Sequence, residues 1–333
     1  MILFVTGAGG FLGRAVVDAA RAAGHDVRAL VRDPARWSGP APDDHLRLVA
    51  GDLRAAGPWT EALDGVDVVV HLAATKAGDL HSQFAGTVVG TERLLAALAE
   101  RPPTRLVHVS TFSVYDYDRL AVGAVLDEDA ALVARPETRD EYCQTKLVQE
   151  RLVRRFAAEA TTEVVVVRPG AVWGPGELWD GGGLVGLGPG RTLVVGPRGA
   201  LKLTYVTNCA EAIVAAATAP GAAGATLNVV DDDPPTPRRF AAALGAAGLQ
   251  VPRGVPVPYG LVAGVAALLA ALNRRFAGGR AKLPGIVVPA KLAAWAKPLR
   301  YPNDRARTVL GWRPRLDLDA AARDCADRSG STS

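Results

Sequence analysis

The chain has 333 residues, 49% of them hydrophobic, which is enough to bury a large core as one big domain or two smaller ones. Its net charge is only +4, and its basic and acidic residues look interspersed, which disfavours nucleic acid as a partner. Three widely spaced cysteines, Cys143, Cys209 and Cys325, predict neither a disulfide framework nor a metal site. We expect a reducing cytoplasm as the simplest compartment and expect no signal peptide before the first apolar run.

Apolar runs alternate with stretches of helical spacing through the first two thirds of the chain. Strands are predicted at residues 2–5, 27–31, 46–49, 66–72, 105–109, 164–168 and 227–230. Helices are predicted at residues 11–23, 83–100 and 138–160. Continuous apolar strands are typical of a parallel sheet that is covered on both faces. The pattern predicts an α/β fold with a doubly wound, Rossmann-type parallel sheet.

The sequence changes character after residue 172. Residues 174–199 are rich in Gly and Pro and predict a long loop with little regular structure. We therefore expect a dinucleotide-binding domain over 1–172, to which 202–231 returns. Residues 173–201 and 232–328 would form a smaller C-terminal substrate-binding or lid region.

Residues 259–272 are almost wholly apolar. This stretch is shorter than the roughly 20 residues that a membrane-spanning helix needs, so a stable span is not expected. A buried or lid helix is the favoured interpretation. The alternative is a helix in a membrane surface, because Arg274 and Arg275 follow directly.

A glycine-rich turn follows the first predicted strand. The segment VTGAGGFLG places Gly7, Gly10 and Gly13 right after that strand and at the start of the first helix, which Phe11 and Leu12 begin. Glycines there let backbone N–H groups approach a pyrophosphate, which the helix N-terminus attracts. The turn therefore predicts a dinucleotide site.

The end of the second strand bears on the choice of cofactor. Val31 takes the position where NAD-binding chains carry an acid, and Arg32 follows it. A guanidinium suits a 2′-phosphate, so NADP(H) is favoured. NAD(H) stays open, with Asp33 as the ribose-binding acid in a shifted register. Asp52, after the third strand, is either an adenine contact or a helix cap.

Two polar groups suited to proton chemistry follow later in the chain. Tyr142 and Lys146 are four residues apart and would share one helix face. An ammonium nearby favours tyrosinate and fits Tyr142 as a general acid or base. Upstream, a predicted strand ends at Ser110 and Thr111, whose hydroxyls can stabilise charge on a reacting oxygen.

Taken in order, these segments resemble an extended short-chain dehydrogenase/reductase of the NAD-dependent epimerase/dehydratase superfamily. The matching segments are TGAGGFLG, GDL, HLAA, VSTFSVYD, YCQTK, VVRPGAVWGPG, TYVTNCAEAI, LNVVDDDPPT and YPNDRARTVLGWRP. The pattern is most similar to the branch of 3β-hydroxysteroid dehydrogenases and β-ketoacid reductases, whose members carry a similar apolar stretch.

The resemblance implies a role for each matching residue. Tyr142 would exchange a proton with the carbonyl, Lys146 would hold the nicotinamide ribose, and Thr111 would bind the reacting oxygen. His71 would pack rather than catalyse. The expected cofactor-binding residues are Gly7, Gly10, Phe11, Leu12, Gly13, Arg32, Asp52, Leu53, Leu72, Ala73, Ala74, Lys146, Pro169, Gly170 and Val172. The resemblance also implies a homodimer built on the helices at 83–100 and 138–160.

Departures from the family pattern reduce the number of reactions that this chain is expected to catalyse. Phe112 and Ser113 stand where sugar-nucleotide dehydratases carry an Asp-Glu pair, so dehydration is disfavoured. Thr87 replaces an Asn that is often present. Aromatic side chains suggest an apolar substrate, with core packing as the alternative for each; the candidates are Phe112, Trp173, Trp179 and Tyr205.

The leading hypothesis is an NADP(H)-dependent oxidoreductase. It would interconvert a ketone and a secondary alcohol on a hydrophobic substrate, of steroid, polyketide or other natural-product type. The alternatives are an NAD-dependent sugar-nucleotide 4-epimerase and a non-catalytic nucleotide-sensing protein. The sensing protein is the weaker alternative because such relatives tend to lose the Tyr-Lys pair.

Overall fold

A seven-stranded parallel sheet forms the centre of the computed structural model, which describes residues 1–178, 184–186, 192–251, 254–278, 280–281 and 283–330. The strand order is β11-β6-β5-β4-β1-β2-β3. The strands are β1 (Ile2–Thr6), β2 (Asp26–Val31), β3 (Leu46–Ala50), β4 (Val68–His71), β5 (Arg105–Val109), β6 (Glu163–Pro169) and β11 (Thr226–Val229). All six neighbouring pairs are parallel, which confirms the predicted fold class.

Each central strand is apolar because both of its faces are covered. In β1, Leu3 and Val5 belong to one core cluster, while Phe4 between them belongs to the cluster on the opposite face. Successive side chains of a strand point to opposite faces, so a run without polar residues is what two covered faces require.

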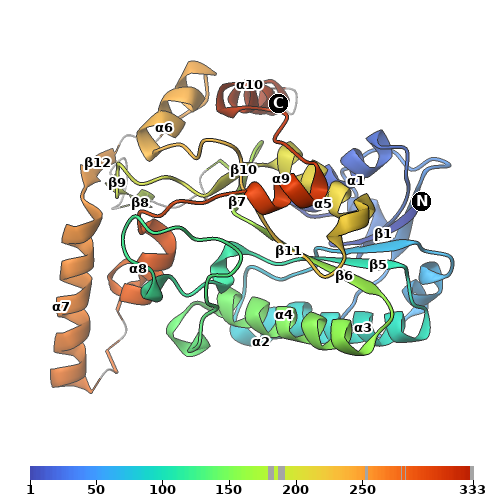
Figure 1. Cartoon of the computed structure of the whole chain (residues 1–333), viewed down its shortest axis with the longest axis horizontal. Coiled ribbons are helices and arrows are strands. Elements are labelled where there is room, and N and C mark those ends of the chain that lie inside the picture. Colours follow the sequence, from blue (N-terminus) through green and yellow to red (C-terminus); the bar gives the residue numbers. More distant parts are fainter. Residues whose placement is uncertain (179–183, 187–191, 252–253, 279, 282, 331–333) are drawn as a thin grey trace.

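Helices pack on the two faces of the sheet (Figure 1). The helices α1 (Phe11–Ala22) and α5 (Val206–Thr218) cover one face, and α9 (Asp304–Leu310) packs beside α5. The other face is covered by α3 (Gly90–Glu100) and α4 (Glu141–Glu159). The helix predicted at 83–100 begins earlier in the structure. There, α2 (Leu80–Phe84) continues through a π-helical turn, η3 (Ala85–Val89), into α3.

Two short strands interrupt the loop with little regular structure that was expected over 174–199. Strand β8 (Leu184–Gly186) is antiparallel to β9 (Thr192–Val195), which pairs in parallel with β12 (Gly254–Val257). Strand β7 (Ala171–Trp173) pairs with β10 (Leu203–Tyr205). The partner strand β12 follows β9 by some sixty residues, so local composition carries no sign of this small sheet.

The C-terminal region adds further helices. These are α6 (Pro237–Ala246), α7 (Tyr259–Ala277), α8 (Pro289–Ala296) and α10 (Leu318–Gly330). Short 3₁₀ helices lie at 34–36, 58–63, 112–114, 117–119, 136–138, 220–222 and 285–287. In Figure 1, α7 stands at the end of the molecule farthest from the chain's N-terminus. Among the described residues, no helix is long and apolar enough to cross a membrane.

Strand β11 lies within the segment 202–231, which was expected to return to the main sheet, and it joins that sheet beside β6. The boundaries drawn between two domains stay a prediction. The three cysteines are free and buried.

Candidate active site

The sheet reverses its strand order between β1 and β4, and parallel sheets bind ligands at the carboxyl ends of the strands beside such a reversal. Gly7 follows β1 with a φ of +69°, a conformation that L side chains rarely adopt. A Cβ on Gly7 would lie 2.8 Å from the backbone N of Ala73, which follows β4. The structure therefore brings the glycine turn and the predicted 72–74 segment together.

The N-terminus of α1 has open backbone donors. Gly10 caps the helix without a side-chain hydrogen bond, and the first turn holds no acid. A Cβ on Gly13 would lie only 2.1 Å from the Gly7 carbonyl oxygen, so glycine is required for the turn to close on the helix. Free N–H groups at a helix N-terminus, next to a turn rich in glycine, fit a pyrophosphate.

Positive charge gathers where β2 ends. Arg32 is exposed there, and Arg14 Nη1 donates to Gly9 O at 3.1 Å and to Ser38 Oγ at 3.2 Å. The alternative ribose ligand, Asp33, caps the short helix η1 by accepting from the Ala35 N–H at 3.0 Å. Sequence reasoning missed Arg14; its position directly after Gly13 was the available signal.

Asp52 already has a partner. Its carboxylate accepts from the Arg54 backbone N–H at 2.9 Å and from the Arg54 guanidinium at 2.6 Å, and these bonds lower the pKa of Asp52. Leu53 is buried in the core below. Thr87, which replaces the usual Asn, accepts from the Thr75 backbone N–H at 2.9 Å.

The catalytic candidates lie where β5 ends and α4 begins. Thr111 is partly exposed, and its Oγ1 accepts from the Ser113 N–H at 3.2 Å. Cys143 Sγ donates to Ser113 O at 3.1 Å, which ties the first turn of α4 to this strand end. Tyr142 is partly exposed in that same turn, next to Cys143. Thr111 and Tyr142 thus come from two elements that contact each other.

Lys146 is almost fully buried, with 2% of its surface exposed. Its Nζ donates to Val109 O at 2.7 Å and also to Gln149 Oε1. Burial lowers the pKa of the Lys146 ammonium to about 7, although the nearby Glu150 carboxylate opposes the shift. Its bond to Val109, two residues before Thr111, holds α4 against β5.

Lys146 is bonded to a buried polar network of Gln149, Thr91 and His71, which sequence reasoning missed. Gln149 Nε2 donates to Thr91 Oγ1 at 2.8 Å and to Ala73 O at 3.1 Å. The ring nitrogens of His71 lie 2.7 Å from Thr6 Oγ1 and 2.9 Å from Thr91 Oγ1, and burial lowers the pKa of His71 to about 3. His71 is therefore a neutral, packed side chain. The signal for Gln149 was its spacing, three residues after Lys146 on one helix.

A buried ion pair fixes the next turn of α4. Glu150 accepts from Arg168 and, at 2.6 Å, from the Ser110 hydroxyl. Burial alone would raise the pKa of Glu150, but Arg168, helped by Ser110 and Arg154, lowers it to about 2. The Ser110 hydroxyl is thus engaged by Glu150, whereas within the described chain the Thr111 hydroxyl at the strand end makes only local bonds, donating to Ser113 Oγ at 3.4 Å.

The segment after β6 passes very close to β10. A Cβ on Gly170 would lie 2.4 Å from Lys202 O, and the Ala171 N–H donates to that same oxygen at 2.7 Å. Pro169 is buried and Val172 partly buried beside this crossing. Their contact with a nicotinamide stays a prediction.

The aromatic candidates for substrate contact are core residues in this structure. Phe112 is 1% exposed and packs edge-on against Tyr115 and Tyr301. Trp173 and Tyr205, 1% and 0% exposed, pack against each other. Their burial favours the packing alternative left open for them. Trp179 lies outside the described residues.

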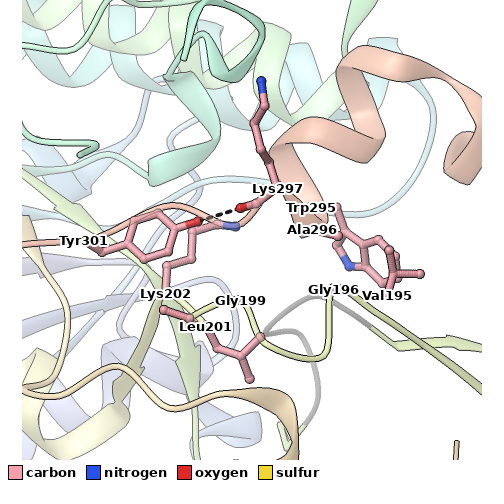
Figure 2. Close-up of a pocket in the computed structure, with 10 residues that line it drawn as sticks. Val195, Gly196, Gly199, Leu201, Lys202, Trp295, Ala296, Lys297 and Tyr301 are labelled. Atoms are coloured by element: carbon pink, nitrogen blue, oxygen red, sulfur yellow. Dashed lines mark hydrogen bonds between the residues drawn. The ribbon is translucent and has the colours of Figure 1, made fainter. Parts of the chain in front are cut away.

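A small pocket lies between the 195–202 segment and the end of α8 (Figure 2). Lys202 Nζ donates to Ala294 O at 2.9 Å and stands 5.3 Å from the centre of the Tyr117 ring. Arg139 stands 5.8 Å from the same ring. Burial, and then the charge of Arg139, lower the pKa of Lys202 to about 8. Among the residues that the structure describes, neither Lys202 nor Arg139 forms a salt bridge.

Comparison with known proteins identifies a matching family and similar proteins. Residues 3–186 match the NAD dependent epimerase/dehydratase family. A 3-diazoavenalumate denitrifying reductase from Streptomyces sp is 32% identical over 335 residues, covering 94% of this chain and 96% of that protein. A 4-hydroxy-2-methyl-3-oxo-4-farnesyl-3,4-dihydroquinoline-1-oxide ketoreductase from Stigmatella aurantiaca is 38% identical over 184 residues. That alignment covers 52% of this chain and about half, 51%, of the ketoreductase.

Solved structures share the whole fold. The UDP-glucuronic acid 4-epimerase from Bacillus cereus, in complex with UDP-glucuronic acid and NAD, superposes with a TM-score of 0.71. The superposition covers 100% of both chains at 19% identity. At this identity the likeness shows the fold alone.

Proposed function

Because the chain belongs to the NAD-dependent epimerase/dehydratase family, and so to the enzymes of the extended short-chain dehydrogenase/reductase class, we propose that it is an NADP(H)-dependent ketoreductase. It would interconvert a ketone and a secondary alcohol on a hydrophobic substrate. The observation that carries the proposal is the contact of α4 with the end of β5. That contact groups Thr111, Tyr142 and the desolvated Lys146.

The residues present fit a dinucleotide. The glycine turn leaves no room for side chains at Gly7 and Gly13, and the N-terminus of α1 offers uncapped donors. A bound NADPH would supply the hydride that the carbonyl carbon accepts. Arg32, assisted by Arg14, would pair with the 2′-phosphate, since Asp33 is engaged as a cap.

Proton chemistry would fall to the chain's own side chains. Thr111 would donate to the carbonyl oxygen, and Tyr142 would give that oxygen its proton as the carbon gains hydride. Lys146, held by Val109 O and Gln149, would bind the ribose and, when charged, favour the tyrosinate left behind. In the alcohol-oxidising direction Tyr142 would act as the base.

The first experiment identifies the nucleotide released from denatured protein and follows NADPH consumption with a panel of apolar ketones. The proposal expects consumption that depends on ketone. Tightly retained NAD with no net consumption would instead favour the 4-epimerase. Nucleotide binding with no turnover of any substrate would favour the sensing protein.

The cofactor preference has its own test. Arg32→Gln should raise the KM for NADPH about tenfold or more and leave that for NADH unchanged, because only the 2′-phosphate contact is lost. Arg47→Gln, an exposed arginine on the neighbouring β3, is the matched control. Equal effects on both cofactors would contradict the assignment of Arg32.

A further inference from the structure

Helix α7 exposes a continuous apolar stripe. Leu261, Val265, Leu268, Leu272 and Phe276 are spaced by three or four residues and so lie on one helix face. Their exposed fractions are 63%, 46%, 60%, 42% and 78%. With Val255 in β12, this end of the molecule holds six of the eleven exposed large hydrophobic residues in the described structure. Such a concentration marks an interaction surface rather than scattered exposure.

The opposite face of α7 is already used. Tyr259, Val262, Ala263 and Ala266 pack against a cluster around Leu292 of α8. The helix is therefore held in place by one apolar face while a second apolar face points outward. This arrangement does not match the expected buried or lid helix, since a lid would direct its stripe toward the body of the protein.

Charge is segregated in the same part of the chain. Residues 234–303 hold ten of the 38 Lys and Arg residues and none of the 34 Asp and Glu residues. The expected interspersion of charges therefore fails over this stretch. Arg274 and Arg275 are exposed in the last turns of α7. Asn273 bonds Ala281 through both its amide nitrogen and its amide oxygen, at 2.9 Å and 3.1 Å, and this keeps the exposed Arg280 beside the helix end.

From this surface we infer that α7 lies along an anionic lipid membrane, with its outward stripe in the acyl boundary and its arginines at the headgroups. An apolar stripe and basic residues on a helix that itself carries no acid are the pattern of helices that lie in a membrane interface. A second copy of the chain fits poorly, because pairing through this face would bring two acid-free, positively charged segments together. The inference does not depend on the proposed reductase activity.

The test is co-sedimentation of the full chain with vesicles. One set is pure phosphatidylcholine and the other contains about one third phosphatidylglycerol. We expect binding to the anionic vesicles, weaker binding at high salt, and little binding to the neutral ones. Leu261→Gln with Leu268→Gln should lower the partition coefficient on anionic vesicles by about tenfold or more, because two leucines that would enter the acyl boundary are lost.

Two further variants keep the test decisive. Leu80→Gln with Phe84→Gln changes two exposed apolar residues of α2 and should leave vesicle binding unchanged. Arg274→Gln with Arg275→Gln removes two charges and keeps every stripe residue, although the Arg275 guanidinium stands 5.7 Å from the centre of the Phe276 ring, and should weaken anionic binding several-fold. The arginine pair remains informative even if the leucine pair fails to fold.

Three results would overturn the inference. The first is absence of binding to anionic vesicles, and the second is equal loss in the α2 control. The third is a concentration-dependent dimer, seen by analytical ultracentrifugation, that the α7 leucine variants abolish, since it would assign the stripe to self-association.

Discussion

Two regions of the molecule differ in the kind of side chain that they bury or expose. One is the buried polar layer formed by Lys146, Gln149, Thr91, Glu150 and Arg168, and the other is the outer face of α7. In the buried polar layer, polar and charged side chains are removed from water, and their hydrogen bonds to one another offset the free energy of desolvation. On α7, large apolar side chains face outward and nothing in the described chain covers them. The first region is built to hold one geometry. The second leaves an apolar face open to solvent in the described structure.

The largest expected effect tests the buried layer. Glu150→Gln should lower the free energy of unfolding by about 3–5 kcal/mol, because it leaves the Arg168 guanidinium buried without its counter-charge. Denaturant unfolding measures it. Glu159→Gln, exposed near the end of the same helix, is the control and should change little. A loss below about 1 kcal/mol for Glu150→Gln would show that this layer is less rigid than its bonding indicates.

A second variant tests how tightly the cofactor turn is packed. Gly13→Ala would place a Cβ 2.1 Å from Gly7 O, so the turn must shift, at a cost of about 1–3 kcal/mol. Binding of dinucleotide, measured by calorimetry, should fall with it. Gly9→Ala, whose Cβ would meet nothing closer than 4.0 Å, should keep its stability. Similar unfolding curves for both variants would contradict the close approach.

His108 differs from the bonded residues of this buried layer. Both of its ring nitrogens are buried without a hydrogen-bond partner. His108→Leu should therefore raise stability at neutral pH by about 1 kcal/mol, since an unsatisfied polar group is removed. A lower unfolding temperature for His108→Leu would mean that the imidazole has a role that the structure does not show.

The free energy of unfolding should depend on pH through the two buried histidines, His108 and His71. Burial holds the pKa values of His108 and His71 below the usual 6.5, so the unfolded chain binds more protons as the pH falls below that value. Stability should therefore fall as the pH drops from 6.5 toward about 3, where His71 itself titrates. His108→Leu should flatten this fall, and an unchanged slope would exclude His108 as a source of it.

The smallest effect belongs to α7. Leu268→Ala should change the free energy of unfolding by no more than about 0.5 kcal/mol, because the side chain is already 60% exposed. Leu98→Ala, a fully buried leucine of α3, is the matched comparison and should cost about 2–5 kcal/mol. A large loss at Leu268 would mean that its stripe is covered in solution.

The sequence predicted the central sheet well because its signals are local. Runs such as Val68–Val70 need both faces covered, and the glycine turn directly follows the first strand. The Thr111, Tyr142 and Lys146 candidates also came from short motifs in a known order. The structure places Tyr142 and Thr111 on contacting elements, but their roles stay predictions.

Features that depend on distant pairings were missed. The small sheet joins β9 to β12, and Glu150 meets Arg168 from another element. The burial of Trp173 depends on Tyr205 and on Phe240 of α6, far along the chain. Neither spacing nor residue type reveals such contacts, so a core aromatic and a substrate contact look alike in sequence.

The most direct test of the proposed reaction follows a labelled hydride. Purified chain is incubated with an apolar ketone and NADPH carrying deuterium at both C4 positions, and the alcohol is examined by NMR. The account predicts deuterium on the carbinol carbon, loss of that product in Tyr142→Phe, and retention of nucleotide binding by that variant. Tyr259→Phe, in α7, should behave like the unmodified chain. Full activity of Tyr142→Phe, or alcohol formed without deuterium at that carbon, would contradict it.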